Sequence, residues 1–331
     1  MRKSKIADLS VYHPARIVTN QELEARLNAK GKLLAEGSLE RLFGLRERRF
    51  AAAGEQVSDL AAQAARPIME RVGAERIGCL IFAAACADLI EPATANIVQH
   101  KLGLHCPAMD VKNACNSFTS GLMMASSLIA AGHYDSVLVV NGEKLSDAIR
   151  MDLDNKEQLC RHLAAYSLGD AGAAALVTAS DDESGFQFQR FMTRGEHWQL
   201  CTIPGGGSMF PHDADKNYFE GQTDALKEVL AEAAAQFFHL CLQEAGWQPE
   251  GIQHFFTHQV SANTFQLIAR LTQVNPACCE QVFTHFGNTA AASIPLAMHQ
   301  RYRRGEIKKG DKVALLGLAA GVSVSVQLLV W

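Results

Sequence analysis

Two stretches of the chain share one order of buried strand, connection and buried strand, and each stretch ends one half of the sequence. The first runs from "SVLVVNGE" (136–143) to "GDAGAAALVTA" (169–179), and the second is "KVALLGLAAGVSVSVQLLVW" (312–331). Continuous apolar runs of this length are typical of strands that are buried on both faces of a sheet. The repeat predicts an internally duplicated α/β chain with two parallel-rich sheets covered by helices.

Apolar strand patterns and alanine-rich helical patterns alternate along the rest of the chain. In the first half we expect a strand at 79–86, a helix at 93–104 that ends near Gly103, and a helix from about Asn116 to Ala131 with Gly132 at its C-cap. In the second half we expect a helix at 223–246, a strand at 252–259, a helix at 262–271, a turn and a helix at 286–305, and the two strands of 312–331.

Charge and hydropathy patterning exclude two classes of partner. The 331 residues carry a formal net charge of −4, whereas a nucleic-acid-binding chain needs a basic face. The one apolar candidate for a membrane span, 312–331, is interrupted by Gly317 and Gly321 and then alternates valine with serine as a strand does. We therefore expect neither a nucleic-acid partner nor a membrane partner.

The cysteines and the N-terminal stretch indicate the cellular compartment in which the protein is expected. Nine cysteines are scattered without CxxC spacing, and "MRKSKIADLSVYHP" lacks the apolar run of a signal peptide. Thiols stay free in reducing compartments, where disulfides are rare. The pattern predicts a cytoplasmic protein with reduced thiols.

Cys115 lies at a predicted strand-to-helix corner in "MDVKNACNSFTSGL" (109–122). A buried core cysteine is the alternative, because free cysteine is among the most buried residue types. At a helix N-terminus, however, unpaired N–H groups and the helix dipole favour a thiolate. The next turn is rich in small residues, which leave the corner accessible as in a nucleophile elbow. The position favours a nucleophile.

A histidine and an asparagine occupy comparable positions in the second half. His258, in "FFTHQVS", ends an apolar run, and such strand ends lie where sites form in α/β sheets. Asn288, in "HFGNTAAASIP", lies in a tight turn before a small-residue helix. Taken singly, each is explained equally well as a structural histidine or a turn asparagine. Together with Cys115 they suit acyl transfer through a thioester.

Other kinds of site fit these residues less well. His254 and His258 have the i, i+4 spacing of a zinc-binding helix, but the run around them is strand-like and no HExxH glutamate is present. A papain-type protease would need a CGSCW-like context around its cysteine, which is missing. The segment "IPGGGS" (203–208) lacks the GK[ST] ending of a phosphate loop and is expected to be a flexible loop.

The three motifs together resemble the thiolase superfamily, specifically its β-ketoacyl-acyl-carrier-protein synthase III group. "DVKNACNSFTSGL" resembles the active-site cysteine segment of that group, "THQVSANTF" its histidine segment and "HFGNTAAASIPLA" its asparagine segment. "GLRERRF" (44–50) and the C-terminal "GDKVALLGLAAGVSVSVQLLVW" are also similar. The resemblance spans nearly the whole chain, and the motifs occur in the family's order.

This resemblance implies the five-layered αβαβα thiolase fold, built from an N-terminal half at 1–182 and a C-terminal half at 183–331. The first half would carry Cys115, and the second would carry His258 and Asn288. The resemblance also implies a homodimeric acyltransferase with no cofactor and no metal ion.

An oxyanion hole is expected at the nucleophile. Its donors would be the backbone N–H of Cys115 and a backbone N–H near Ala320 and Gly321. Hydrogen bonds from such donors stabilise the charge that develops on a thioester carbonyl under attack.

One stretch narrows the resemblance to a branch of the group. "ACADLIEPATANIVQHKLGL" (85–104) places Glu91 before Pro92, where the synthases that initiate fatty-acid synthesis usually have an aromatic residue. A glutamate there resembles the OleA-type branch, which joins two acyl thioesters head to head, and related α-pyrone-forming enzymes. In these relatives the glutamate reaches across the dimer interface into the partner's active site.

The chemistry of such a reaction requires a base. A decarboxylating synthase forms its carbanion by loss of CO2, whereas the joining of two simple acyl thioesters requires removal of an α-proton. A buried carboxylate with a raised pKa is a suitable general base, which we assign to Glu91. The alternative is that Glu91 only complements the dipole at a helix start.

The family's usual donor-binding residues are not all present. Ser38 and Leu42 stand about where a tryptophan and an arginine usually hold the CoA adenine, and "SANTF" replaces a segment that often carries a carrier-protein-docking arginine. The donor is therefore left open between acyl-CoA and acyl-carrier-protein thioesters. We expect Claisen condensation of two acyl thioesters through an acylated Cys115. The alternatives are a decarboxylating synthase that uses a malonyl thioester and a silent partner subunit of a heterodimer.

Overall fold

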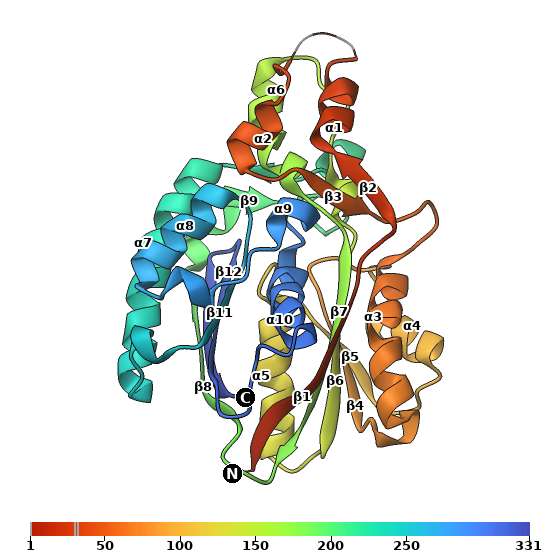
Figure 1. The fold of residues 1–331 in the computed structure, drawn as a ribbon. Helices are drawn as coiled ribbons and strands as arrows, with labels where there is room; N and C mark the ends of the chain where they lie inside the picture. The colour runs from red at the N-terminus through yellow and green to blue at the C-terminus, as the bar shows by residue number, and fades with distance from the viewer. Residues whose placement is uncertain (1, 30, 32) are drawn as a thin grey trace.

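The computed structural model describes residues 2–29, 31 and 33–331 and contains two main sheets (Figure 1). In spatial order, the first sheet consists of β1 (Lys3–Tyr12), β7 (Ala171–Ser180), β6 (Ser136–Glu143), β4 (Cys79–Ala83) and β5 (Ala108–Val111). The second consists of β11 (His254–Thr257), β12 (Lys312–Ala319), β13 (Ser323–Val330) and β8 (Gly185–Thr193). Each sheet is therefore built from a separate part of the chain.

The two sheets repeat one topology. The order β4–β6–β7–β1 corresponds to β11–β12–β13–β8, and in both the first pair is parallel and the next two pairs are antiparallel. This confirms the internal duplication. The expectation of parallel-rich sheets is wrong, because the last two strands of each half pair antiparallel. In the second half they are joined by a tight turn, which permits only that direction.

Helices form three further layers around the sheets (Figure 1). The central layer consists of α5 (Ser117–Ala130) and α10 (Ser293–Arg303), which share one buried cluster with both sheets. The outer layers are α3 (Val57–Val72) and α4 (Thr94–Leu102) on the first sheet, and α7 (Thr223–Ala245) and α8 (Ala262–Thr272) on the second. The αβαβα order of layers predicted from the resemblance is confirmed.

Side-chain alternation along β4 shows why a sheet in this fold needs helices on both faces. Ile81 contacts the cluster that contains α5, whereas Leu80 and Phe82 contact the cluster that contains α3 and α4. Successive side chains of a strand point to opposite faces, so a strand that is apolar at every position must be covered twice.

The expected elements are present with small shifts at their ends. α4 ends at Leu102, and Gly103 caps it in the left-handed conformation, as predicted. The C-cap of α5 is Ala131 rather than the predicted Gly132, which follows it with a φ of 78°. The strand predicted at 79–86 ends at Ala83, because the chain then leaves the sheet.

A small cap that the sequence did not predict lies at one end of the layers (Figure 1). It contains α1 (Asn20–Leu27), α2 (Ser38–Phe43), α6 (Lys156–His162) and the two-stranded antiparallel sheet of β2 (Arg16–Thr19) and β3 (Glu47–Phe50). Buried apolar side chains hold the cap together, and Cys115 packs against this cluster. The cap therefore covers the end of the layers at which α5 begins.

The structure also contains the short strands β9 (Cys201–Thr202) and β10 (Glu220–Gly221) and the one-turn helix α9 (Phe283–Phe286). Among the residues that the structure describes, no helix has both the length and the apolar character needed to cross a bilayer. The apolar C-terminal run forms β12 and β13 instead.

Candidate active site

Cys115 lies in a sharp corner between β5 and α5. The preceding residue, Ala114, has a φ of 46°, a left-handed conformation that is uncommon for a residue with a Cβ. Two short contacts close the corner: Asn116 N donates to Asn113 O (2.9 Å), and Ser117 Oγ donates to Ala114 O (2.7 Å). The predicted strand-to-helix corner is therefore present, with Cys115 two residues before the first residue of α5.

The C-terminal half holds the start of α5 in place. Asn116 Nδ2 donates to Ser323 O (3.0 Å), and Gln327 Nε2 donates to Thr119 O (2.6 Å). A Cβ on Gly317 would lie 1.9 Å from Asn116 Oδ1, so only glycine permits this close approach of β12 to the helix start. The position of Cys115 thus depends on strands that follow it by two hundred residues or more of sequence.

His258 follows β11 directly and is buried. Its Nδ1 lies 3.2 Å from Ser293 Oγ, at the start of α10, and its backbone N donates to Leu316 O (3.3 Å). Its ring also forms a hydrogen bond with the backbone of Ala290. The imidazole is therefore held from two sides by the turn and helix that follow Asn288.

Asn288 lies in the turn between α9 and α10 and is also buried. Its backbone N donates to Ser167 O (2.7 Å), and its backbone O accepts from Gly169 N (3.0 Å). Its side-chain Oδ1 accepts from Ala290 N (3.0 Å). Because this contact occupies the carbonyl end of the carboxamide, the Nδ2 end is the one available for donation to a substrate.

Ala290 is a common neighbour of two predicted residues, His258 and Asn288, and shares an apolar cluster with the third, Cys115. This residue packs in the apolar cluster that Cys115 contacts, its backbone contacts the His258 ring, and its N–H orients Asn288. Ala290 has a φ of 43°, so two of the three non-glycine residues with positive φ in the described chain flank these side chains. Such conformations cost on the order of 1–3 kcal/mol each and cluster at functional sites.

Burial sets the protonation states of this cluster. It raises the pKa of the Cys115 thiol, with smaller contributions from Cys201 and Glu143, and it lowers the pKa of His258 to about 4. Both groups are therefore neutral at pH 7. Burial thus acts against the thiolate that the helix start is expected to favour.

The low pKa of His258 predicts a pH dependence of stability. In the unfolded chain a histidine titrates near 6.5, so protons bind the unfolded state preferentially as the pH falls from about 6.5 to 4. The stabilisation from neutral His258 is complete above this window and is lost across it, by on the order of 3 kcal/mol at the acid end. Burial also lowers the pKa of His299 to about 4, so His299 adds to the loss of stability in the same pH window.

Chemical denaturation of the wild type and of His258→Asn between pH 4.5 and 7.5 measures this effect. The free energy of unfolding of the wild type should fall more steeply toward acid than that of the variant, since both retain His299. Equal slopes in the two proteins would contradict a depressed pKa at His258.

Glu91 differs from His258 and Asn288 in its exposure. It is exposed, in the loop between β4 and α4, beside Leu89 (53% exposed) and Ile90 (85% exposed). The beginning of the loop is firmly held, because the buried carboxylate of Glu143 accepts from Ala85 N (2.9 Å) and Cys86 N (3.2 Å). The loop therefore presents Glu91 and two apolar side chains at the surface.

Two further sets of sequence-predicted residues have clear positions. Ala320 and Gly321 form the turn between β12 and β13, and Gly321 has a φ of 112°. His254 lies on β11, not on a helix, and both ring nitrogens have protein partners: Asp311 Oδ2 at 3.0 Å and Arg301 Nη1 at 3.2 Å. Among the described residues, no group of three or more His, Cys, Asp or Glu side chains is placed to hold a metal ion.

Sequence reasoning missed Glu143 and Ala290. Glu143 is fully buried, burial raises its pKa, and its charge acts on the Cys115 thiol. The available signal was an acidic residue that ends the fully apolar strand "SVLVVNGE". Ala290 carried no such signal, because only its backbone takes part in the site.

Comparisons with known proteins agree with this geometry. Residues 109–195 match the family described as 3-oxoacyl-[acyl-carrier-protein] synthase III, and residues 242–331 match its C-terminal part. An acyl-CoA:acyl-CoA alkyltransferase of Xanthomonas campestris pv. campestris is 31% identical over 343 residues, which cover 98% of either chain. A β-ketoacyl-[acyl-carrier-protein] synthase III of Chlamydia muridarum is 30% identical over 321 residues, 94% of either chain.

Solved structures extend the similarity to the whole fold. A structure of Xanthomonas campestris OleA with bound lauric acid and lauroyl-CoA has a TM-score of 0.90 and 29% identity, covering 100% of this chain and 99% of that one. The synthase III of Aquifex aeolicus has a TM-score of 0.86 and 26% identity, covering 99% of this chain and 100% of that one. The chain described here belongs to the 3-oxoacyl-[acyl-carrier-protein] synthase III family of thiolase-fold acyltransferases.

Proposed function

We propose that the protein joins two acyl thioesters by Claisen condensation through an acyl group carried on Cys115, and that the product is a β-keto acid or thioester. The observation that carries the proposal is that Ala290 contacts both His258 and Asn288 and lies in the apolar cluster against which Cys115 packs. The names of the relatives support it, since one is an acyl-CoA:acyl-CoA alkyltransferase and OleA binds lauroyl-CoA. Acyl-CoA is accordingly the donor we favour.

The first half-reaction is acyl transfer to the thiol. Cys115 attacks the thioester carbonyl, the S–C bond to the leaving thiol breaks, and the Cys115 proton leaves with that thiol. The oxyanion is stabilised by the N–H of Cys115 and an N–H near Ala320 and Gly321, each worth roughly 3–4 kcal/mol in the barrier. Since burial keeps the resting thiol protonated, deprotonation accompanies the attack.

The second half-reaction forms the carbon–carbon bond. Neutral His258 and the free Nδ2 of Asn288 donate hydrogen bonds to the carbonyl oxygen of the second thioester as its enolate develops. Glu91 accepts the α-proton, the enolate carbon attacks the acyl group, and the Cys115–acyl bond breaks to release the thiolate. No CO2 is produced in this sequence.

Glu91 requires a second copy of the chain in this scheme. The single chain presents it at the surface beside exposed Leu89 and Ile90, whereas His258 and Asn288 are buried. We infer a homodimer in which each loop completes the partner's site, with the halves 1–182 and 183–331 acting as one unit in each subunit. A free thiol nucleophile also favours a cytoplasmic location.

Product analysis with pairs of acyl-CoA chain lengths tests this function. We expect β-keto products from saturated acyl-CoA alone, without CO2 release and without a requirement for malonyl-CoA. A decarboxylating synthase, which the synthase III relatives make the second candidate, would require malonyl-CoA and release CO2. A silent subunit of a heterodimer would form no acyl adduct by itself.

A further inference from the structure

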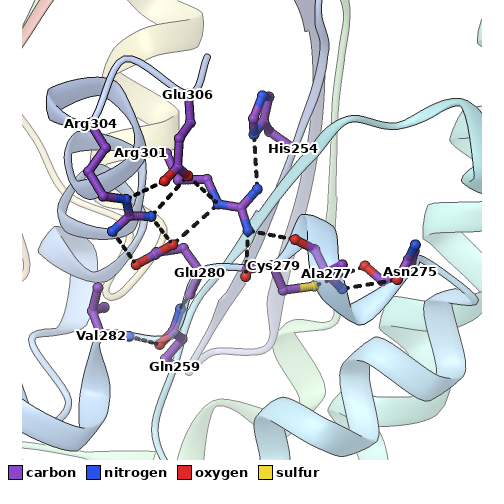
Figure 2. A network of polar contacts seen from close by, with 10 residues as sticks. All are labelled: His254, Gln259, Asn275, Ala277, Cys279, Glu280, Val282, Arg301, Arg304 and Glu306. Carbon is purple, nitrogen blue, oxygen red and sulfur yellow. Dashed lines mark hydrogen bonds and ion pairs between the residues drawn. The ribbon is translucent and has the colours of Figure 1, made fainter.

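Gln259, the residue after His258, is almost completely buried (1% exposed) and binds three backbone groups of another segment. Its Oε1 accepts from Val282 N (2.9 Å) and Phe283 N (3.3 Å), and its Nε2 donates to Glu280 O (2.6 Å). Figure 2 shows this side chain pointing toward Val282. Two N–H donors face one end of the amide and a carbonyl faces the other, which defines the orientation of the amide.

The segment that Gln259 holds leads directly to Asn288. Phe283 is the first residue of α9, a helix of only four residues, and its carbonyl accepts from Gly287 N (2.8 Å). Gly287, with a φ of 71°, then connects α9 to Asn288. Because so little chain lies between Phe283 and Asn288, a displacement of one is passed to the other. Gln259 therefore ties the backbone at His258 to the backbone that carries Asn288.

The same segment is held from the opposite side by α10 (Figure 2). Arg301 Nη2 donates to the carbonyl oxygens of Ala277 (2.7 Å) and Cys279 (2.9 Å). The carboxylate of Glu280 binds Arg304 Nη2 at 2.6 Å and Arg301 Nε at 3.2 Å. These contacts hold segment 277–283 on the side of α10, and the buried side chain of Gln259 connects it by hydrogen bonds to the histidine loop.

We infer that Gln259 is a positioning residue that sets the spacing between the His258 and Asn288 side chains during condensation, which rests on the function proposed above. Both side chains must meet one carbonyl oxygen, so their separation has a narrow permitted range. A misplacement of about 1 Å can reduce a rate by about a hundredfold. Gln259 itself is not placed to bind a substrate, since it is 1% exposed and both ends of its amide bind backbone groups of segment 280–283.

Gln259→Met tests the inference, because methionine has a similar shape and cannot form these hydrogen bonds. We expect kcat for condensation to fall by about 10- to 100-fold. Acylation of Cys115, measured by intact mass, should be retained, since Cys115 is placed by α5 and β13 rather than by segment 277–283. KM for the acyl thioester should change less than threefold or so, because no substrate contact is removed.

Asn28→Leu is a matched control. Asn28, which is far from Gln259 in the sequence, makes the same pattern of contacts. Its Oδ1 accepts from Leu33 N (2.8 Å) and Leu34 N (3.0 Å), and its Nδ2 donates to Leu34 O (2.9 Å). This variant should lower Tm while kcat is retained. A Gln259→Met protein that loses Tm but keeps wild-type kcat would overturn the positioning role, as would equal loss of acylation and condensation.

Gln259→Glu provides a second variant if Gln259→Met does not fold. Its carboxylate keeps both acceptor contacts with Val282 and Phe283 but repels the Glu280 carbonyl, so we expect at least about a tenfold loss of kcat with acylation retained. Wild-type kcat in this variant would also overturn the inference. Failure of the wild-type protein to condense any acyl-CoA pair would instead disprove the proposed function, so the two failures are distinguishable.

Discussion

Replacement of Cys115 with alanine is expected to abolish the acyl adduct and to reduce condensation by roughly 10⁴-fold or more, as removal of a covalent nucleophile does in other enzymes. Cys115 packs against the apolar cluster of the cap, and alanine preserves most of that packing. Intact mass after incubation with an acyl-CoA, followed by product analysis, measures both effects.

Cys201→Ala is the appropriate control for this substitution. Cys201 is near enough to affect the Cys115 thiol, and burial likewise raises its own pKa, to about 12. It has no strained corner before it, so we expect the Cys201 variant to gain one acyl group as the wild type does. An acyl adduct of wild-type stoichiometry on the Cys115→Ala protein would show that the nucleophile is a different residue.

Replacement of Glu91 with glutamine is expected to leave the acyl adduct intact and to reduce condensation by about 10²- to 10⁴-fold. Glutamine has the same shape but cannot accept the α-proton. The loop should keep its conformation, since Glu143 holds its beginning and Asp88 Oδ1 accepts from Ser58 N (3.0 Å). Acylation is followed by intact mass and condensation by product formation.

Glu250→Gln is a control for the loss of an exposed carboxylate, and it should retain the wild-type condensation rate. A Glu91→Gln protein that condenses at the wild-type rate would exclude Glu91 as the base. Mixed dimers of the Cys115→Ala and Glu91→Gln chains test whether Glu91 acts in the site of its own subunit or in that of the partner. If Glu91 acts across the interface, one site of each mixed dimer holds both groups, and activity returns. If it acts within its own chain, the mixture stays inactive.

The candidate site could be predicted from the sequence because each of its side chains follows a local signal. Cys115 stands where an apolar strand pattern changes to a helical one, His258 ends a strand, and Asn288 lies in a glycine turn before a helix. Chain positions of this kind collect at one end of an α/β sheet. The layered fold was predictable for a similar reason, since burial on two faces leaves continuous apolar strands.

The cap and the direction of strand pairing were not predictable in this way. The cap forms from short, mixed segments whose apolar side chains, such as Leu23 and Leu39, are buried in one cluster with residues from distant parts of the chain, including Ala290. β1 and β8 have no continuous apolar run, and each is an edge strand of its sheet. Their pairing depends on partners far away in sequence.

The sequence by itself determined the chemical groups of the site, the duplicated order of elements and the strand ends at which those groups lie, because these follow from local residue patterns. Only the tertiary structure decided that the pKa of the Cys115 thiol is raised and that of the His258 ring is lowered, since loss of hydration depends on everything packed around a group. It also decided that Gln259 joins the histidine loop to segment 280–283. Contacts between distant segments exist only once the chain has folded.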